Sequence, residues 1–113
     1  LENKTHVPFD IKRIYYLYDV PKGQQRGFHA HYELEQVIFA LKGSFDLVLD
    51  DGKEKKTYHL NSPNSFIVIP KMIWRELINF SENAICMVIA SMSFNEADYI
   101  RDYDTFLEAV KKE

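Results

Sequence analysis

Short alternating runs of apolar and polar residues, separated by turn signals, dominate this sequence. Residues 11–18 are rich in β-branched and aromatic residues on both faces, and residues 44–50 alternate, with Phe45, Leu47 and Leu49 on one side. Further strand-like runs cover residues 28–31, 36–41, 55–60, 65–69, 73–80 and 84–91. About eight short strands with frequent turns are typical of a β-sandwich or a closed barrel. We therefore expect an all-β fold.

The C-terminal end departs from this alternation. Asp104 or Thr105 is suited to cap a helix, Glu108 completes a capping box with Thr105, and Lys111 lies near the C-terminal end. The sequence therefore predicts one short helix after the last strand.

Length and charge narrow the possible functions. The 113 residues suit one domain spanning 1–113, and a net charge of −3 disfavours nonspecific nucleic-acid binding. The longest apolar runs are too short to span a membrane, and the chain does not open with a signal segment. The single cysteine, Cys86, excludes a disulfide framework and favours a reducing, cytoplasmic location.

The residues best suited to chemistry are two histidines in one short strand. His29 and His31 are two positions apart, so both side chains face the same side of a strand. Two imidazoles on one wall suit either metal ligation or proton transfer.

The frame around these histidines resembles the two motifs of the cupin family of small β-barrels. The first motif is matched in spacing by Gly23, His29, His31, Gln36 and Gly43, with Gln36 where cupins have glutamate. The second is matched by Asn64, Pro70, Met72, Arg75 and Asn79, with Arg75 where cupins have a ligand histidine. Asn64 replaces a glycine, which asparagine can do because it tolerates a left-handed φ. The resemblance implies a cupin or jelly-roll-like small β-barrel.

The two replaced ligands change the expected chemistry. Arg75 has no lone pair and repels a divalent cation, and Gln36 is neutral. We therefore expect no metal and no cofactor. A histidine can instead take a proton from carbon beside a carbonyl, while a fixed cation such as Arg75 stabilises the enolate oxygen. His29 and His31 are therefore candidates for this proton transfer, with Arg75 and Gln36 as candidates to hold and orient the oxygens.

A closer resemblance covers almost the whole chain. The strings in residues 11–16, 26–31, 49–52 and 98–104, together with Trp74, are similar to those of the TDP-4-keto-6-deoxy-D-glucose 3,4-ketoisomerases. The resemblance implies a metal-independent cupin that moves a keto group from C4 to C3 through an enediol. On this basis His29 is the leading candidate base, His31 is its proton-shuttling partner, and Arg75 and Gln36 are enediolate stabilisers. It also implies a TDP-linked 4-keto-6-deoxyhexose as substrate, a homodimer with exchanged N-terminal strands, and a role in bacterial surface sugars such as those of lipopolysaccharide and S-layers.

Four further residues are candidates for substrate binding. Arg26 either binds the diphosphate or forms an ion pair at a strand edge, and Arg101 either packs in a dimer or contacts the nucleotide. Tyr16 and Tyr18 share one strand face, which is either the pocket wall or the outer layer, because alternation alone does not say which face points inward.

Two alternatives to the ketoisomerase remain open from the sequence. A 3,5-epimerase of the same substrates also needs a histidine beside a ketone, and a sugar-nucleotide-binding module needs no turnover at all. The first residue is leucine and not methionine, so we expect the chain to be a trimmed piece or part of a longer product. We also expect the chain to lack the N-terminal strand pair that the resembled family usually has.

Overall fold

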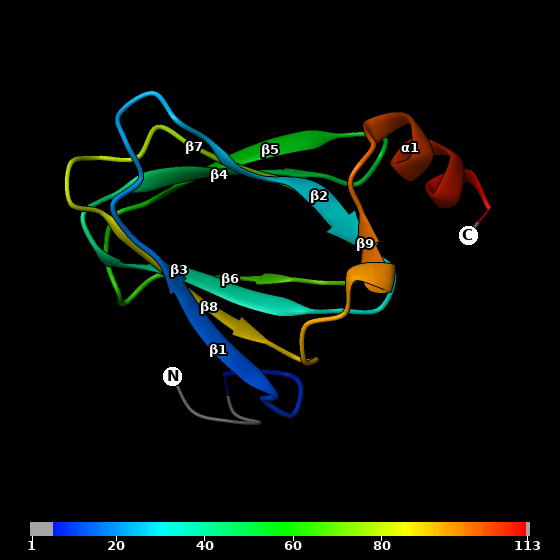
Figure 1. Cartoon of the computed structure of the whole chain (residues 1–113), viewed down its shortest axis with the longest axis horizontal. Coiled ribbons are helices and arrows are strands. Elements are labelled where there is room, and N and C mark those ends of the chain that lie inside the picture. The colour runs from blue at the N-terminus through cyan, green and yellow to red at the C-terminus, as the bar shows by residue number, and fades with distance from the viewer. Residues whose placement is uncertain (1–5, 113) are drawn as a thin grey trace.

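Two antiparallel sheets lie face to face, and one helix covers their end (Figure 1). The computed structural model describes residues 6–112. The strands are β1 (Arg13–Leu17), β2 (Arg26–His31), β3 (Gln36–Lys42), β4 (Phe45–Asp50), β5 (Lys55–Leu60), β6 (Phe66–Ile69), β7 (Trp74–Ile78), β8 (Ile85–Ala90) and β9 (Tyr99–Ile100). A short 3₁₀ helix, η1 (Glu96–Asp98), precedes β9, and α1 (Tyr103–Lys111) follows it.

The strand order is β1-β8-β3-β6 in one sheet and β5-β4-β7-β2-β9 in the other. The expected all-β, jelly-roll-like class with a short C-terminal helix is confirmed. Within residues 6–112 the strands pair in two sheets, whose inner side chains meet in the core. No helix in this part of the chain is both long and apolar enough to cross a membrane.

The core forms where the alternating apolar residues of both sheets point toward each other. Phe45, Leu47 and Ile38 are completely or almost completely buried there, and Phe45 stacks on Phe80. Cys86 belongs to the same cluster, and burial raises the pKa of its thiol to about 12. This thiol is therefore a core filler and not a nucleophile.

Helix α1 begins earlier than the sequence indicated. Asp102, and neither Asp104 nor Thr105, is the N-cap, and its carboxylate accepts hydrogen bonds from the backbone N–H and the hydroxyl of Thr105. The apolar face of the helix packs Phe106 against Trp74, which confirms that Trp74 lies outside the pocket.

The second cupin motif keeps one of its two glycine conformations. Met72, at a glycine position of the motif, adopts a φ of 62°, which is the left-handed region that glycine usually supplies. Asn64 is not among the residues with positive φ, so the expectation that it imitates a glycine was wrong.

Gly27 is the residue that lets β2 pass close to β7. Its φ is +84°, and a Cβ built there would lie 2.9 Å from Leu77 Cδ1 and 3.1 Å from the Arg75 carbonyl oxygen. Gly23 has a nearly equal φ of +85°, but a Cβ built there has no atom within 4 Å.

We expect Gly23→Ala to lower the free energy of unfolding by about 1 kcal/mol, from backbone strain alone. Gly27→Ala should lower it by about 1–2 kcal/mol more, measured by urea denaturation. Equal losses in the two variants would contradict the close approach.

Candidate active site

A bulge in β2 brings the two histidines to the inner face of the sheet. The pairing of β2 with β7 shifts between Gly27 and His29, and Phe28 at the bulge adopts a φ of 59°. Phe28 therefore points outward, while His29 pairs with Arg75 of β7. The rings of His29 and His31 lie edge to face, with centroids 4.9 Å apart. The predicted shared face is confirmed.

A pocket of about 240 Å³ opens between the two sheets beside His29. Its apolar walls include Ile38, Leu77 and Val88 from three different strands. Its polar lining consists of Tyr15, Arg26, His29, Gln36, Arg75, Tyr99 and Arg101. A few convergent polar groups in an otherwise apolar hollow are typical of a small-molecule site.

A chain of hydrogen bonds crosses the floor of this pocket. Arg75 donates from Nη1 to Gln36 Oε1 at 2.5 Å and from Nη2 to the carbonyl of Ile73 at 2.9 Å. Gln36 donates in turn from Nε2 to Tyr15 Oη at 3.0 Å. Tyr15 therefore accepts from the amide and keeps its own hydroxyl hydrogen for another partner.

Arg75 is a buried cation without a carboxylate in hydrogen-bond contact. It is 1% exposed, and burial lowers its pKa to about 10, so it remains charged at neutral pH. Burial also raises the pKa of Tyr15, so this phenol stays protonated. On its floor the pocket thus presents the positive charge of Arg75 beside the neutral hydroxyl of Tyr15.

The two histidines occupy different depths. His29 lines the pocket, whereas His31 is completely buried next to it. His31 Nδ1 lies 3.2 Å from Oδ2 of Asp98, a carboxylate that is itself buried. His29 Nδ1 and His31 Nε2 are buried and have no hydrogen-bond partner in the described chain.

Both imidazoles are held neutral. Burial, followed by the positive charge of Arg75, lowers the pKa of His29 to about 3, and the same two causes lower the pKa of His31 to about 3. A neutral imidazole retains a lone pair and can accept a proton.

The depressed pKa of His29 predicts acid sensitivity of the fold. Because the unfolded chain binds a proton at His29 below about pH 6.5 and the folded chain does not until about pH 3, stability falls as pH falls through this window. Between pH 7 and pH 5, His29 should contribute a loss of about 2 kcal/mol in the free energy of unfolding. His29→Asn should remove that part of the slope in urea titrations, whereas His59→Asn, at an exposed histidine, should not. An unchanged slope in His29→Asn would contradict the assigned shift.

The donor set does not fit a divalent metal ion. In residues 6–112 no cluster of three or more His, Cys, Asp or Glu side chains is arranged to hold one. At the two positions where cupins carry further ligands, Gln36 is occupied by hydrogen bonds at both ends and Arg75 supplies a positive charge. We therefore derive no step through a metal.

The candidate substrate-binding residues fall into two groups. Arg26 and Arg101 line the pocket, and both are exposed. The Arg101 guanidinium lies over the Tyr99 ring and pairs with Glu96 through two hydrogen bonds of 2.7 and 2.8 Å.

Tyr16 and Tyr18 do not reach the pocket of this chain. They are 56% and 59% exposed on the outer face of β1, where their rings contact each other. Tyr15 and Leu17 face inward instead. Tyr16 and Tyr18 were candidates for the pocket wall or for the outer layer, and the structure places them in the outer layer. The reason is that β1 turns its odd-numbered side chains to the core.

Three residues of the site were missed from the sequence. Tyr15 is on the inner face of β1, Tyr99 packs against both histidines, and Asp98 contacts His31. The strand-like run indicated that either Tyr15 or Tyr16 faces inward, but the sequence did not show which of the two faces is the inner one. Asp98 and Tyr99 had none beyond the resemblance of their string, since the contact with β2 spans more than sixty residues.

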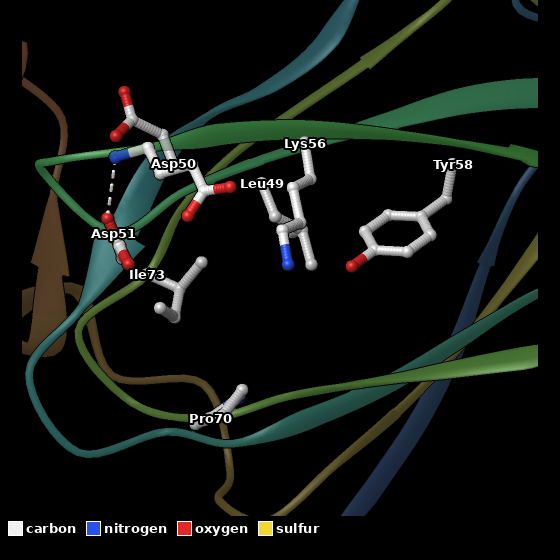
Figure 2. A pocket seen from close by; sticks show the side chains of 8 residues that line it. Leu49, Asp50, Asp51, Lys56, Tyr58, Pro70 and Ile73 are labelled. Atoms are coloured by element: carbon white, nitrogen blue, oxygen red, sulfur yellow. Dashed lines mark hydrogen bonds between the residues drawn. The ribbon is translucent and has the colours of Figure 1, made fainter.

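A second hollow lies away from this chemistry. Figure 2 shows it between β5 and the end of β6, with Lys56, Tyr58 and Ile73 directed into it. Its volume is about 160 Å³, and it contains none of the histidines. Lys56 there is exposed and Asp51 closes the adjacent hairpin through Lys53 and Glu54.

The fold and the pocket together define a cupin-type protein suited to proton transfer beside a carbonyl. A model of the FdtA family, described as WxcM-like, C-terminal, matches residues 1–111. The chain therefore belongs to this family.

Individual relatives give the same result. The chain is 41% identical over 112 residues to the TDP-4-oxo-6-deoxy-alpha-D-glucose-3,4-oxoisomerase of Aneurinibacillus thermoaerophilus, covering 99% of this chain and 81% of that protein. It matches the crystal structure of a 3,4-ketoisomerase from Helicobacter canadensis with 51% identity and a TM-score of 0.95, covering 98% and 84% of the two chains.

A third relative was solved with a sugar nucleotide. A histidine-to-asparagine variant of the 3,4-ketoisomerase QdtA from Thermoanaerobacterium thermosaccharolyticum, in complex with TDP-4-keto-6-deoxyglucose, matches with 40% identity and a TM-score of 0.96. The match covers 100% of this chain and 82% of that one. The relatives are thus TDP-sugar 3,4-ketoisomerases, as the resemblance of the sequence implied.

Proposed function

We propose that this protein is an isomerase that moves the keto group of TDP-4-keto-6-deoxyglucose from C4 to C3. The observation that carries this proposal is the pairing of His29 with Arg75 across β2 and β7, both lining one pocket. It places a neutral base opposite a fixed cation, as enolisation of a ketone requires. The relatives described above, which act on such sugars by name, support the same substrate.

The proposed reaction proceeds through an enediol. His29 removes the proton from C3, and the negative charge that develops on O4 is stabilised by Arg75, whose orientation is held by Gln36. O4 gains a proton, O3 loses one as its carbonyl forms, and a proton is delivered to C4. Overall, one hydrogen moves from C3 to C4 and one from O3 to O4, so no oxidant or reductant is needed.

The protein's own groups account for these proton transfers. His31 is the proton-shuttling partner behind His29, because its ring packs against that of His29. Tyr15 is suited to exchange a proton with a substrate oxygen, since its hydroxyl hydrogen is not used by Gln36.

The direct test is turnover in D₂O. Protein is incubated with TDP-4-keto-6-deoxyglucose and a chelator, and the sugar is followed by NMR. Appearance of a 3-keto sugar with deuterium at C4 would support the proposal. Exchange at C3 or C5 with the ketone left at C4 would favour a 3,5-epimerase, and binding without exchange would favour a sugar-nucleotide-binding module.

Arg26 is proposed to bind the diphosphate at the pocket mouth. Its guanidinium is exposed and, within residues 6–112, donates a hydrogen bond only to the neighbouring Gln25 carbonyl, so its remaining donors are open to phosphate oxygens. Arg26→Gln should raise the Kd for TDP about tenfold, which is the effect of losing about 1.4 kcal/mol. Lys22→Gln removes a nearby loop cation that does not line the pocket, and calorimetry should show an unchanged Kd. Equal weakening in both variants would point to general charge and contradict a specific contact.

We also propose that the protein acts as a cytoplasmic homodimer. The outer face of the edge strand β1 exposes Ile14, Tyr16 and Tyr18, three large side chains that are each more than half exposed. An apolar face beside an unpaired strand edge is suited to association with a second copy, including exchange of N-terminal strands. Tyr16→Lys should shift the mass measured by sedimentation toward the monomer if this face is the interface. The proposed cytoplasmic location rests on a different observation, because the free thiol of Cys86 is consistent with a reducing compartment.

A further inference from the structure

Asp98 is a carboxylate in the interior of the protein, at the end of η1 and just before β9. It is 6% exposed and receives three hydrogen bonds. Oδ1 accepts from the backbone N–H of Glu33 at 2.9 Å, and Oδ2 accepts from the N–H of Leu34 at 3.1 Å. Oδ2 also lies 3.2 Å from Nδ1 of His31. Both backbone groups are N–H donors, so the carboxylate oxygens act as acceptors toward them.

An acceptor at this place determines which nitrogen of His31 carries the hydrogen. Nδ1 must donate to Asp98, so in the neutral ring Nε2 carries the lone pair. This Nε2 is buried and unpartnered in the described chain, and so is Nδ1 of His29 on the neighbouring ring. The two rings are in contact edge to face, with centroids 4.9 Å apart, so a His31 ring fixed by Asp98 limits the orientations open to the His29 ring.

We propose that Asp98 is a positioning residue that selects the Nδ1–H form of His31 and, through the packed ring of His31, the orientation of the base His29. This inference rests on the proposed function, because it assigns the base by that reaction. It adds a third member to the histidine pair, in which Asp98 acts only through His31 and does not touch the substrate. The logic is that of a carboxylate behind a catalytic imidazole.

The competing explanation is that Asp98 only anchors the loop between β2 and β3. Asp98 holds the N–H groups of Glu33 and Leu34, and its backbone carbonyl accepts from Tyr32. Ser91 provides a matched control, because its Oγ accepts from the N–H of Glu35 at 2.8 Å in the same loop without a recorded contact to either histidine.

The test compares Asp98→Asn with Ser91→Ala. An asparagine with its NH₂ in the place of Oδ2 donates to His31 Nδ1 and reverses the tautomer, while the N–H of Leu34 loses its acceptor. The ¹⁵N NMR signals of the four imidazoles, assigned with His6→Asn, His29→Asn and His59→Asn variants, report the tautomer of His31 without any turnover. We expect Nδ1–H at His31 in the wild type and Nε2–H in Asp98→Asn. The kcat of Asp98→Asn should fall about 10²-fold with KM nearly unchanged, whereas Ser91→Ala should keep the wild-type tautomer and a kcat within about twofold.

The outcomes separate the two proposals. A wild-type His31 with hydrogen on Nε2 overturns the role of Asp98 whether or not the variant folds. A reversed tautomer with unchanged kcat, or equal losses of kcat in Asp98→Asn and Ser91→Ala, overturns it as well and leaves a loop anchor. A wild type that does not isomerise the sugar overturns the proposed function, and with it the catalytic role of Asp98, even where the NMR signals show the expected tautomer.

Discussion

Replacing His29 by asparagine should lower kcat for the ketoisomerase reaction by about 10³-fold while leaving the fold and the affinity for TDP unchanged. The magnitude is that of losing a positioned general base. Asparagine has a similar size, remains neutral like the native imidazole and cannot accept the C3 proton. The measurements are the rate of 3-keto sugar formation by NMR, deuterium incorporation from D₂O, the melting temperature and TDP binding by calorimetry.

The matched control for this variant is His59→Asn. His59 lies on β5, is exposed and pairs with Asp46, so its replacement should leave kcat unchanged. If His29→Asn retained more than a tenth of the wild-type kcat, another group would have to be the base. If it lost TDP binding in parallel with kcat, His29 would be a binding residue.

Arg75→Met should separate catalysis from stability more clearly than any other variant. We expect kcat to fall by about 10²- to 10³-fold, because the fixed cation that stabilises the enediolate is lost. The melting temperature should stay the same or rise, because a fully buried cation without a carboxylate in hydrogen-bond contact is replaced by an apolar side chain of similar length. Kinetics and thermal unfolding monitored by circular dichroism measure both effects.

Arg13→Met is the control for removing an interior cation. Arg13 lies over the Tyr15 ring at 4.8 Å, has two buried guanidinium nitrogens without partners, and does not line the pocket. Its replacement should cost less than about tenfold in kcat, because it touches the site only through Tyr15. Equal losses in the two variants would show that total positive charge matters and that the position of Arg75 does not.

The strands were predictable because each has a strong local pattern. Alternation over residues 44–50 places Phe45 and Leu47 in the core by itself, and the same rule correctly placed His29 and His31 on one face. The absence of two cupin ligands could also be read from the sequence, because Gln36 and Arg75 stand at the motif spacing. Family resemblance added the substrate class, which no local pattern specifies.

The features that could not be predicted from the sequence are those that depend on tertiary contacts. Residues of both parities in β1 are aromatic, so the choice between Tyr15 and Tyr16 as pocket residue depends on how the strand docks on β8. Strand β9 has two residues and exists only because it pairs with Ala30 and His31 of β2. Asp98 precedes it, and its contact with His31 therefore could not be seen before the chain was folded.

The order of strand pairing has a consequence for how quickly activity is acquired. Of the pairings seen in residues 6–112, only β4 with β5 joins strands that are consecutive in the chain. The remaining pairings close long loops, and β1 meets β8 only after most of the polypeptide has been made. Such topologies fold in milliseconds to seconds, with rates limited by the entropy of loop closure. Tyr15 comes from the non-local pairing of β1 with β8, and His29 and Arg75 come from the non-local pairing of β2 with β7. In refolding experiments, isomerase activity should therefore return with the slowest phase, later than the protection of the β4–β5 backbone amides from hydrogen exchange.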